Sequence, residues 1–312
     1  MSKYDCLVIG NAMFDVIFNA EKQIQIISGG TGYCRNFYFS PGGAGNIAVA
    51  LALLGEKTVF AGKVGNDLLG QMYIDDLKQN QVQPKIFIDE NSATGVALTL
   101  SSPKERSFIV YSGANTSLNL QEIETLKPLI KQSKFFYFTG FALTEDPQRE
   151  AIVKAAEIAH AFNCKVVFDP GSHNLIHQNL SMFLTLLKLT DVLSINELEA
   201  KAITNCNRLN EVIKHLSAYV PLVAIRLGAK GSVLVTNEVL VKTTAGNVKS
   251  KDSTGAGDAY TAALMHGLNL NLPLRDVGKF ANWFASQKVK NYGARAFPKT
   301  KECTAYLAKL KQ

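Results

Sequence analysis

The sequence has little cysteine, and its cysteines form no recognisable framework. They are Cys6, Cys34, Cys164, Cys206 and Cys303. No C-x-x-C pair occurs and the number is odd, which argues against a zinc site and against a set of disulfides. The five histidines also lack the H-E-x-x-H spacing of a zinc protease. We therefore expect a protein of a reducing compartment, the cytoplasm.

Long hydrophobic runs and blocks of like charge are missing too. No apolar stretch reaches the roughly 18 residues that a membrane span needs, and the start, MSKYDCLVIG, has too short an apolar run for a signal peptide. The net charge is +7, but no basic block of five or more residues occurs. Because nucleic-acid-binding proteins concentrate their charge, we expect neither a membrane nor a nucleic acid as partner. No G-x-x-x-x-G-K-[ST] motif is present, which excludes a P-loop kinase.

What the sequence does contain is an alternation of short apolar strands with helical patterns. Strands are predicted over residues 6–9, 58–64, 135–139, 166–168, 192–195, 223–225 and 232–235. Helices are predicted over residues 47–54, 121–132, 147–162, 180–188 and 209–219. This order predicts an α/β fold with a mainly parallel central sheet and helices on both faces. We expect residues 1–312 to form a single domain.

Two regions break the alternation, residues 12–40 and residues 94–112. The first holds short apolar segments at 16–18, 24–27 and 37–39, and the second is typical of a hairpin around residues 101–105. Neither has room for a crossover helix, so we predict a small antiparallel sheet inserted into the α/β body as a lid. Exposed lid strands could pair between chains, which makes a homodimer through the lid a hypothesis.

The most informative segment is DSTGAGDAY at residues 252–260, which leads into a helical run. The small residues Gly255, Ala256 and Gly257 let successive backbone N–H groups converge at a helix start, where the helix dipole also favours an anion. Asp258 then lies in the first helical turn, and its carboxylate could accept a proton from an attacking hydroxyl. Alone, such an Asp could equally do no more than complement the helix dipole.

The whole nine-residue string resembles the C-terminal signature of the ribokinase-like (PfkB-type) carbohydrate and nucleoside kinases. Further family elements follow in the family's order: GNAMFD at 10–15, GGAGN at 42–46, GNDLLG at 65–70 and NELE at 196–199. The resemblance covers nearly the whole chain and implies a ribokinase-like fold with a small β-sheet lid. It also implies transfer of the γ-phosphoryl group of ATP to a hydroxyl of a small sugar. In that reaction Asp258 is the general base, and the backbone of 255–257 is the anion hole.

The resemblance implies binding roles as well. The residues implied to bind the acceptor hydroxyls are Asn11, Asp15, Gly42, Gly43 and Asn46. Asn196 and Glu199 resemble the pair that organises the Mg²⁺–phosphate region, with Glu199 acting through water because Mg²⁺ keeps much of its hydration. Ordinary helix capping is the alternative for these two residues.

Nucleotide and cation sites are implied in the last third of the chain. Arg226, Gly228 and Gly231 resemble the ATP-contacting T-x-G-x-x-G segment. Arg226 stands where Thr is usual, which puts a hydroxyl contact in doubt, although Arg can itself pair with phosphate. The same glycines could form a plain turn. Asp252 resembles part of a monovalent-cation site, with residues 293–298 as its second half. The implied cofactors are thus Mg²⁺ with ATP, and K⁺ as a further hypothesis.

The acceptor is the least determined feature. Residues 138–141 resemble the adenosine-kinase side of the family, and many sugar kinases carry Asp-Pro-Asn-x-Arg where this chain has DPGSH at 169–173. That departure puts a ketohexose acceptor in doubt. Four lid aromatics could stack on a base, or form the lid's own core or a dimer contact: Phe18, Tyr33, Phe37 and Phe39. We expect a pentose-like sugar as acceptor, with a ribonucleoside as the alternative.

Two other functions compete with a kinase. Residues 43–48 fit G-x-G-x-x-A, and Asp67 lies about twenty residues on, as in an NAD-dependent Rossmann oxidoreductase. Those glycines follow the lid-like region rather than the first core strand, and the string at 252–260 would be left unexplained. A non-catalytic sensor with the same fold is a third possibility, but the retained Asp258 argues against it.

Overall fold

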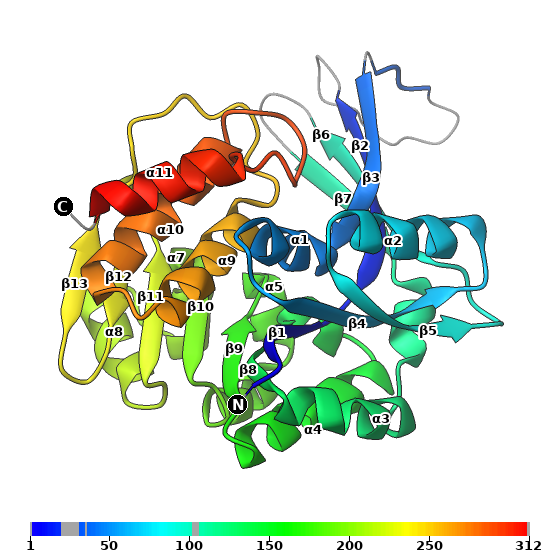
Figure 1. Ribbon diagram of the computed structural model, residues 1–312, viewed down its shortest axis with the longest axis horizontal. Coiled ribbons are helices and arrows are strands. Elements are labelled where there is room, and N and C mark those ends of the chain that lie inside the picture. Colours follow the sequence, from blue (N-terminus) through cyan, green and yellow to red (C-terminus); the bar gives the residue numbers. More distant parts are fainter. Residues whose placement is uncertain (1, 20–30, 35, 102–105, 311–312) are drawn as a thin grey trace.

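The structure is a computed structural model that describes residues 2–19, 31–34, 36–101 and 106–310. Figure 1 shows a central sheet between two layers of helices, with a smaller sheet projecting from one side. The strand predicted over 24–27 and most of the turn predicted over 101–105 lie outside the described residues.

The central sheet consists of nine strands. They are β1 (Tyr4–Ile9), β4 (Thr58–Gly65), β5 (Gln83–Asp89), β8 (Ser133–Thr139), β9 (Lys165–Asp169), β10 (Val192–Asn196), β11 (Leu222–Arg226), β12 (Ser232–Val235) and β13 (Leu240–Thr243). Their order is β13-β12-β11-β10-β9-β8-β1-β4-β5. All pairs are parallel except those that β12 and β13 make at one edge. Since parallel strands are covered on both faces, they need continuous apolar runs, and all eight residues of β4 are buried.

Helices cover both faces of this sheet (Figure 1). One apolar core lies under α3 (Leu120–Lys131), α4 (Gln148–Ala161), α5 (His173–Gln178), α6 (Leu180–Leu187), α7 (Glu197–Thr204) and α8 (Leu209–Ser217). The other lies under α1 (Gly45–Leu53), α2 (Leu68–Gln79), α9 (Ala256–Asn269), α10 (Leu274–Lys288) and α11 (Thr300–Leu310). Short 3₁₀ turns are η1 (Gly113–Ser117), η2 (Gly140–Leu143) and η3 (Gly228–Lys230). The predicted α/β architecture is confirmed.

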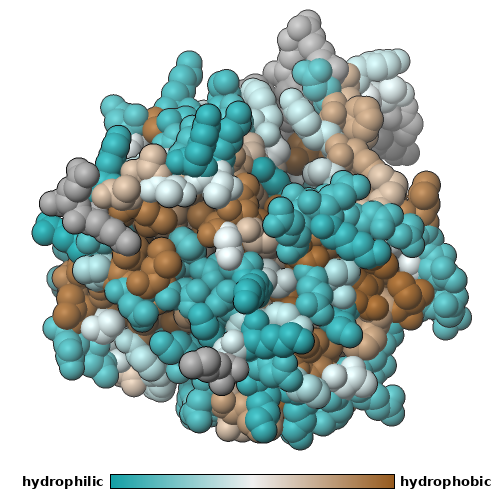
Figure 2. All heavy atoms as spheres, viewed as in Figure 1, coloured by the Kyte–Doolittle hydropathy of each residue, from teal (hydrophilic) through white to brown (hydrophobic). Residues whose placement is uncertain are grey.

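The number of buried residues in α1 and in α2 follows from how apolar each helix is. α1 is apolar around its circumference, and seven of its nine residues are buried. Gly55 follows it with φ +93°, the left-handed conformation expected after a helix C-terminus. α2 buries only Gly70, Tyr73 and Leu77, and Figure 2 shows hydrophilic side chains gathered over it. In the described part of the chain, no helix is both long and apolar enough to cross a membrane.

The small sheet contains β3 (Asn36–Gly43), β2 (Ala12–Asn19), β6 (Gly95–Ser101) and β7 (Arg106–Tyr111), in that order. The hairpin predicted in residues 94–112 is confirmed by the antiparallel β6–β7 pair. The prediction of a wholly antiparallel lid is wrong, because β2 and β6 run parallel. The chain between them passes through β3, α1, β4, α2 and β5, and such a long crossover lets two strands align in parallel.

Candidate active site

A cavity of about 1440 Å³ lies where the carboxyl ends of the parallel strands meet the lid. The last residues of β8, β9, β10 and β11 all line it: Thr139, Asp169, Asn196 and Arg226. Asp15 and Met13 reach it from the lid strand β2. Ligands of open α/β sheets bind in this position, because loops and helix starts converge at the carboxyl edge of the strands.

The cavity brings together most of the residues predicted from the sequence. Those that line it are Asn11, Asp15, Gly43, Asn46, Asn196, Glu199, Arg226, Gly228, Gly231, Gly255, Ala256, Gly257 and Asp258. Gly42 does not line it, but a side chain there would collide with the Asp15 carboxylate. Asp252 does not line it either, but the next two residues, Ser253 and Thr254, do.

The loop before α9 has the geometry that an anion site requires. Gly255 caps the helix with φ +74°, and a side chain there would strike the carbonyl oxygen of Ala294. Only glycine suits this position, since it combines a left-handed backbone with a close approach. Gly255, Ala256 and Gly257 line the cavity at the start of α9, and Asp258 lies in the first turn, as predicted. The Ala256 N–H donates to the Ser253 carbonyl oxygen at 3.1 Å, so the N–H groups of Gly255 and Gly257 are the ones left to face an anion.

Opposing charges act on Asp258. The pKa of Asp258 is raised to about 7, chiefly by burial and also by the charge of Asp169. The guanidinium of Arg226 and a hydrogen bond from Asn46 act in the opposite direction. A carboxyl with a pKa near 7 can take up a proton and release it again near neutral pH, which suits a general base.

Arg226 is the charged centre of the cavity floor. Its Nη1 donates to Asp169 Oδ2 at 2.7 Å and to Ser194 Oγ at 2.8 Å, and Nη2 lies 3.6 Å from Glu199 Oε2. Its side chain is 14% exposed, so the pairing is largely shielded from water. Both terminal nitrogens face carboxylates, and the predicted pairing of Arg226 with phosphate stays a prediction.

Asp169 was missed as a functional residue by sequence reasoning. Its position at the end of a buried parallel strand was a usable signal, because such ends converge on one edge of a sheet. Its role as the partner of Arg226 depends on β10 lying between β9 and β11. Residues Ala245, Gly246, Asn247, Val248 and Ser250, which also line the cavity, carried no sequence signal at all.

Asn196 and Glu199 form a reciprocal helix cap at the start of α7. Asn196 Oδ1 accepts from the Glu199 N–H at 2.9 Å, and Glu199 Oε2 accepts from the Asn196 N–H at 2.9 Å. The capping alternative is therefore present in the structure. Because Glu199 also faces the cavity, capping does not exclude a second role. Burial and the charge of Asp169 raise the pKa of Glu199.

The predicted acceptor residues are held by a second layer of side chains. Arg295 Nε donates to Asn46 Oδ1 at 2.8 Å, and the same guanidinium pairs with Asp76. Because the Asn46 oxygen is held by Arg295, the NH₂ group of the Asn46 amide is directed toward Asp258. This NH₂ group donates the hydrogen bond that lowers the pKa of Asp258. Burial raises the pKa of Asp15 to about 6, against the lowering effect of Arg295.

Asn11 is fixed from two sides. Its Oδ1 accepts from Gln148 Nε2 at 2.6 Å, and its Nδ2 donates to the carbonyl oxygen of Phe141 at 3.1 Å. The Phe141 ring lines the cavity and is 49% exposed. A Cβ at Gly171 would lie 2.6 Å from this ring, and Gly171 has φ +76°. The ring position therefore depends on the glycine of the DPGSH segment.

Three of the four predicted lid aromatics, Phe18, Phe37 and Phe39, lie on the lid face away from the cavity. Residues paired across β2 and β3 share a face, and Phe18 pairs with Phe37 while Val16 pairs with Phe39. Asp15 lies on the other face, because side chains alternate along a strand. Phe37 and Phe39 contact Phe18 and Phe14, with ring centroids 6.2 and 4.8 Å apart. This arrangement does not support stacking of Phe18, Phe37 and Phe39 on a base. It favours the alternatives, in which these rings form the core of the lid or a dimer contact on the lid face away from Asp15.

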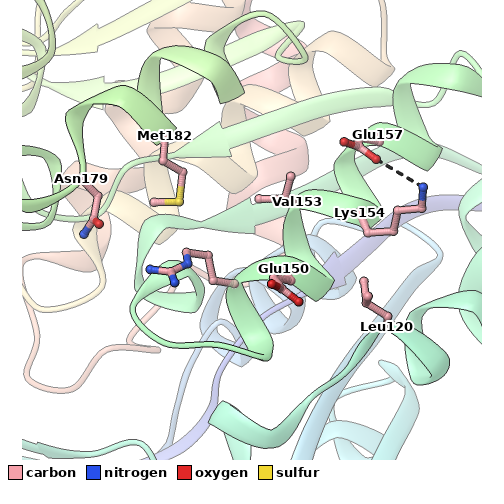
Figure 3. A pocket seen from close by; sticks show the side chains of 8 residues that line it. Leu120, Glu150, Val153, Lys154, Glu157, Asn179 and Met182 are labelled. Atoms are coloured by element: carbon pink, nitrogen blue, oxygen red, sulfur yellow. Dashed lines mark hydrogen bonds and ion pairs between the residues drawn. The ribbon is translucent and has the colours of Figure 1, made fainter.

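A second depression, of about 450 Å³, lies between α3, α4 and α6. Figure 3 shows that Val153 and Met182 contribute apolar walls and that Lys154 pairs with Glu157. That ion pair is 3.4 Å long and solvent-exposed. Within the described residues, no group of three or more His, Cys, Asp or Glu side chains could hold a metal, here or elsewhere. We assign no site to this depression.

Comparisons with known proteins show which proteins this chain resembles. The model of the pfkB family carbohydrate kinases matches residues 3–301. An uncharacterized sugar kinase of Pyrococcus horikoshii is 31% identical over 310 residues, which cover 96% of this chain and 94% of that protein. Fructokinase-2 of Solanum lycopersicum is 30% identical over 239 residues, 73% of each protein. The crystal structure of adenosine kinase from Sinorhizobium meliloti superposes with a TM-score of 0.88 at 27% identity, covering 100% of both chains.

Proposed function

Because the chain belongs to the pfkB family of carbohydrate kinases, we propose that it transfers the γ-phosphoryl group of ATP to a hydroxyl of a small sugar. The observation that carries this proposal is Asp258 in the first turn of α9, beside the N–H groups of 255–257 and in one cavity with Asp15 and Asn46. A base, an anion site and an acceptor site are the parts that such a transfer needs.

In the proposed reaction the phosphoryl group passes directly from ATP to the acceptor, without a covalent bond to the protein. The acceptor hydroxyl oxygen bonds to the γ-phosphorus, the bond from that phosphorus to the bridging β,γ-oxygen breaks, and ADP leaves. Asp258 takes the hydroxyl proton, and the backbone of 255–257 stabilises the charge on the transferring group through the N–H groups of Gly255 and Gly257. Asp15, with Asn11 and Asn46, would hold the other acceptor hydroxyls, and closure of the lid would exclude water.

We propose that Mg²⁺ enters with the nucleotide. The carboxylates nearest the floor, Asp169 and Glu199, already pair with Arg226, and the described residues hold no preformed metal cluster. This donor set fits an ion bound by phosphate oxygens and waters, with Glu199 facing its hydration shell. When bound, the ion would neutralise phosphate charge. Gly228 and Gly231 line the cavity with Arg226, and the space next to Gly228 is open, which leaves room for ATP there. A side chain at Gly231 would instead collide with the Thr243 carbonyl oxygen.

Asp258→Asn tests the base. The variant keeps the shape and hydrogen bonding of the side chain but cannot accept the proton. We expect kcat to fall by roughly 10²–10⁴-fold or more with ATP affinity largely kept. The measurement is coupled ADP release, together with calorimetric titration of ATP. Turnover close to wild type would contradict the assignment of Asp258 as the base.

A ribonucleoside acceptor is the second candidate, favoured by two exposed aromatic rings that line the cavity. Phe108 and Phe141 line the cavity and are 63% and 49% exposed, so both present ring surface that a base could cover. ADP release with ribose, fructose, adenosine, inosine and cytidine separates the candidates. Turnover of ribose alone supports the sugar, and preference for a nucleoside supports the alternative. Release with none of them, despite ATP binding, would favour a sensor.

Three further expectations remain proposals. We propose that the whole chain acts as one kinase domain, and that it works in the cytoplasm, where its free cysteines would stay reduced. We also propose a homodimer through the lid, supported by apolar side chains exposed on the lid face that points away from the cavity.

A further inference from the structure

A lysine is buried directly behind the anion site. Lys288 ends α10, and its side chain is 0% exposed. Its Nζ donates to the backbone carbonyl of Asp252 at 2.9 Å and lies 4.0 Å from Asp252 Oδ2. A charged ammonium is almost never buried unless it is paired, because removing it from water is costly. The sequence-based expectations assigned Lys288 no role.

The ammonium lies where two loops are joined. Asp252 Oδ1 accepts from the backbone N–H of Thr254 at 2.9 Å, and Oδ2 accepts from the Gly293 N–H at 2.9 Å. Gly255 packs directly on Ala294. The segments that resemble the two halves of a monovalent-cation site therefore do lie together. Where these two segments meet, the oxygen atoms of Asp252 already face the ammonium group of Lys288.

We propose that the Lys288 ammonium is the resident cation of the anion-site loop, so that the protein does not need K⁺ there. Lys288 is a positioning residue: it holds the Asp252 carbonyl, Asp252 holds Thr254 and Gly293, and these fix the loop that starts α9. A potassium ion fits poorly. It would lie beside an ammonium of the same charge, and Asp252 is the acidic group paired with that ammonium at this junction.

Thermal unfolding tests this without any knowledge of the acceptor. Melting temperatures are measured in about 150 mM KCl and in tetramethylammonium chloride of equal ionic strength, since the larger ion cannot enter the site. Wild type should melt within about 1 °C in both salts, because a ligand raises the melting temperature only if it binds the folded state. A saturable rise of several degrees with K⁺ would overturn the proposal.

Lys288→Met is the informative variant, because it fills the space of the stem and removes the charge. It should melt lower in tetramethylammonium and regain several degrees with K⁺ or NH₄⁺, with saturation. Lys290→Met is the matched control: Lys290 donates to Gln287 Oε1 at 2.7 Å and is partly exposed, so no cation response is expected. If Lys288→Met melts alike in all three salts, the ammonium is not acting as the cation and the proposal fails.

Lys288→Arg keeps the charge and covers the case in which Lys288→Met does not fold. It should fold and stay insensitive to K⁺, and a saturable K⁺ response in it would count against the proposal. The effect on catalysis rests on the proposed function. With a turned-over acceptor, wild-type kcat should differ by less than about twofold between the salts, and Lys288→Met should recover activity with K⁺. If no acceptor is turned over, the proposed function fails, while the melting data still decide the role of Lys288.

Discussion

At the scale of single residues, the ionisation of Asp258 depends on Asp169 and Arg226, which are paired with each other. The pKa of Asp258 is raised to about 7. Burial has the largest effect, the charge of Asp169 also raises the pKa, and the charge of Arg226 lowers it. The other groups that act on Asp258 are Asn46, whose hydrogen bond lowers its pKa, and Asp15, whose charge raises it. A base must be deprotonated to act, so activity should be low in acid and rise as the pH passes through about 7.

Removing one charge at a time should move this pH profile in opposite directions. Arg226→Gln removes the positive charge that lowers the pKa of Asp258, so the acid limb of kcat/KM should shift up by about one pH unit. Asp169→Asn removes a negative charge that raises it, so the limb should shift down. The measurement is kcat/KM from pH 5 to 9, with melting temperatures taken at each pH.

Arg226→Lys is the control for charge. It keeps the positive charge and loses the forked geometry, so its acid limb should stay near that of wild type even if kcat falls. Shifts of the same sign in Arg226→Gln and Asp169→Asn would show that the profile reports loss of structure rather than the electrostatics of Asp258.

At the scale of elements, two loops at the carboxyl edge form part of the proposed acceptor side of the cavity. The turn η2 after β8 presents the Phe141 ring, and the loop after β9 accommodates it with Gly171. If the ring stacks on a base, Phe141→Ala should lower kcat/KM for ribonucleosides about 5- to 150-fold, as expected for about 1–3 kcal/mol of stacking. Free pentoses should lose less than about threefold.

Phe162→Ala is the matched control for that variant. Phe162 is also a partly exposed ring, 37% exposed, but it follows α4 and contacts Lys131 instead of the cavity. It should leave both acceptors unaffected. If Phe141→Ala lowers kcat/KM equally for ribonucleosides and pentoses, the ring contributes to the shape of the site and does not stack on a base. The sugar would then be the remaining candidate acceptor.

The elements themselves were largely predictable from sequence, whereas contacts between distant elements were not. The buried strands and α1 show in the apolar runs, and the position of Asp258 follows from the glycines that begin α9. The parallel β2–β6 pair could not be inferred, because pairing depends on where a crossover returns. Lys288 was missed because a lysine at a helix end is normally exposed; its burial depends on loops around Asp252 and Gly293, distant in sequence.

At the scale of the whole molecule, the lid leaves one apolar sheet face in solvent. The residues on the face away from Asp15 include Phe37, Phe39 and Ile109, which are 64%, 43% and 51% exposed. Ile109 pairs with Leu98 and Phe39 with Val16, so these side chains form a continuous surface across the four strands. Exposed apolar faces of this kind are typical of protein–protein contacts.

We expect this face to be covered by the same face of a second copy, which closed twofold symmetry allows. Wild type should then elute at about twice the chain mass of 34.0 kDa in size-exclusion chromatography with light scattering. Ile109→Lys should give the monomer, because a buried charge without a partner is strongly unfavourable. Val239→Lys, a change at a side chain 46% exposed between β12 and β13, should leave the mass unchanged. A monomeric wild type at micromolar concentration would refute the dimer, and the lid face would then need another partner to explain its apolar surface.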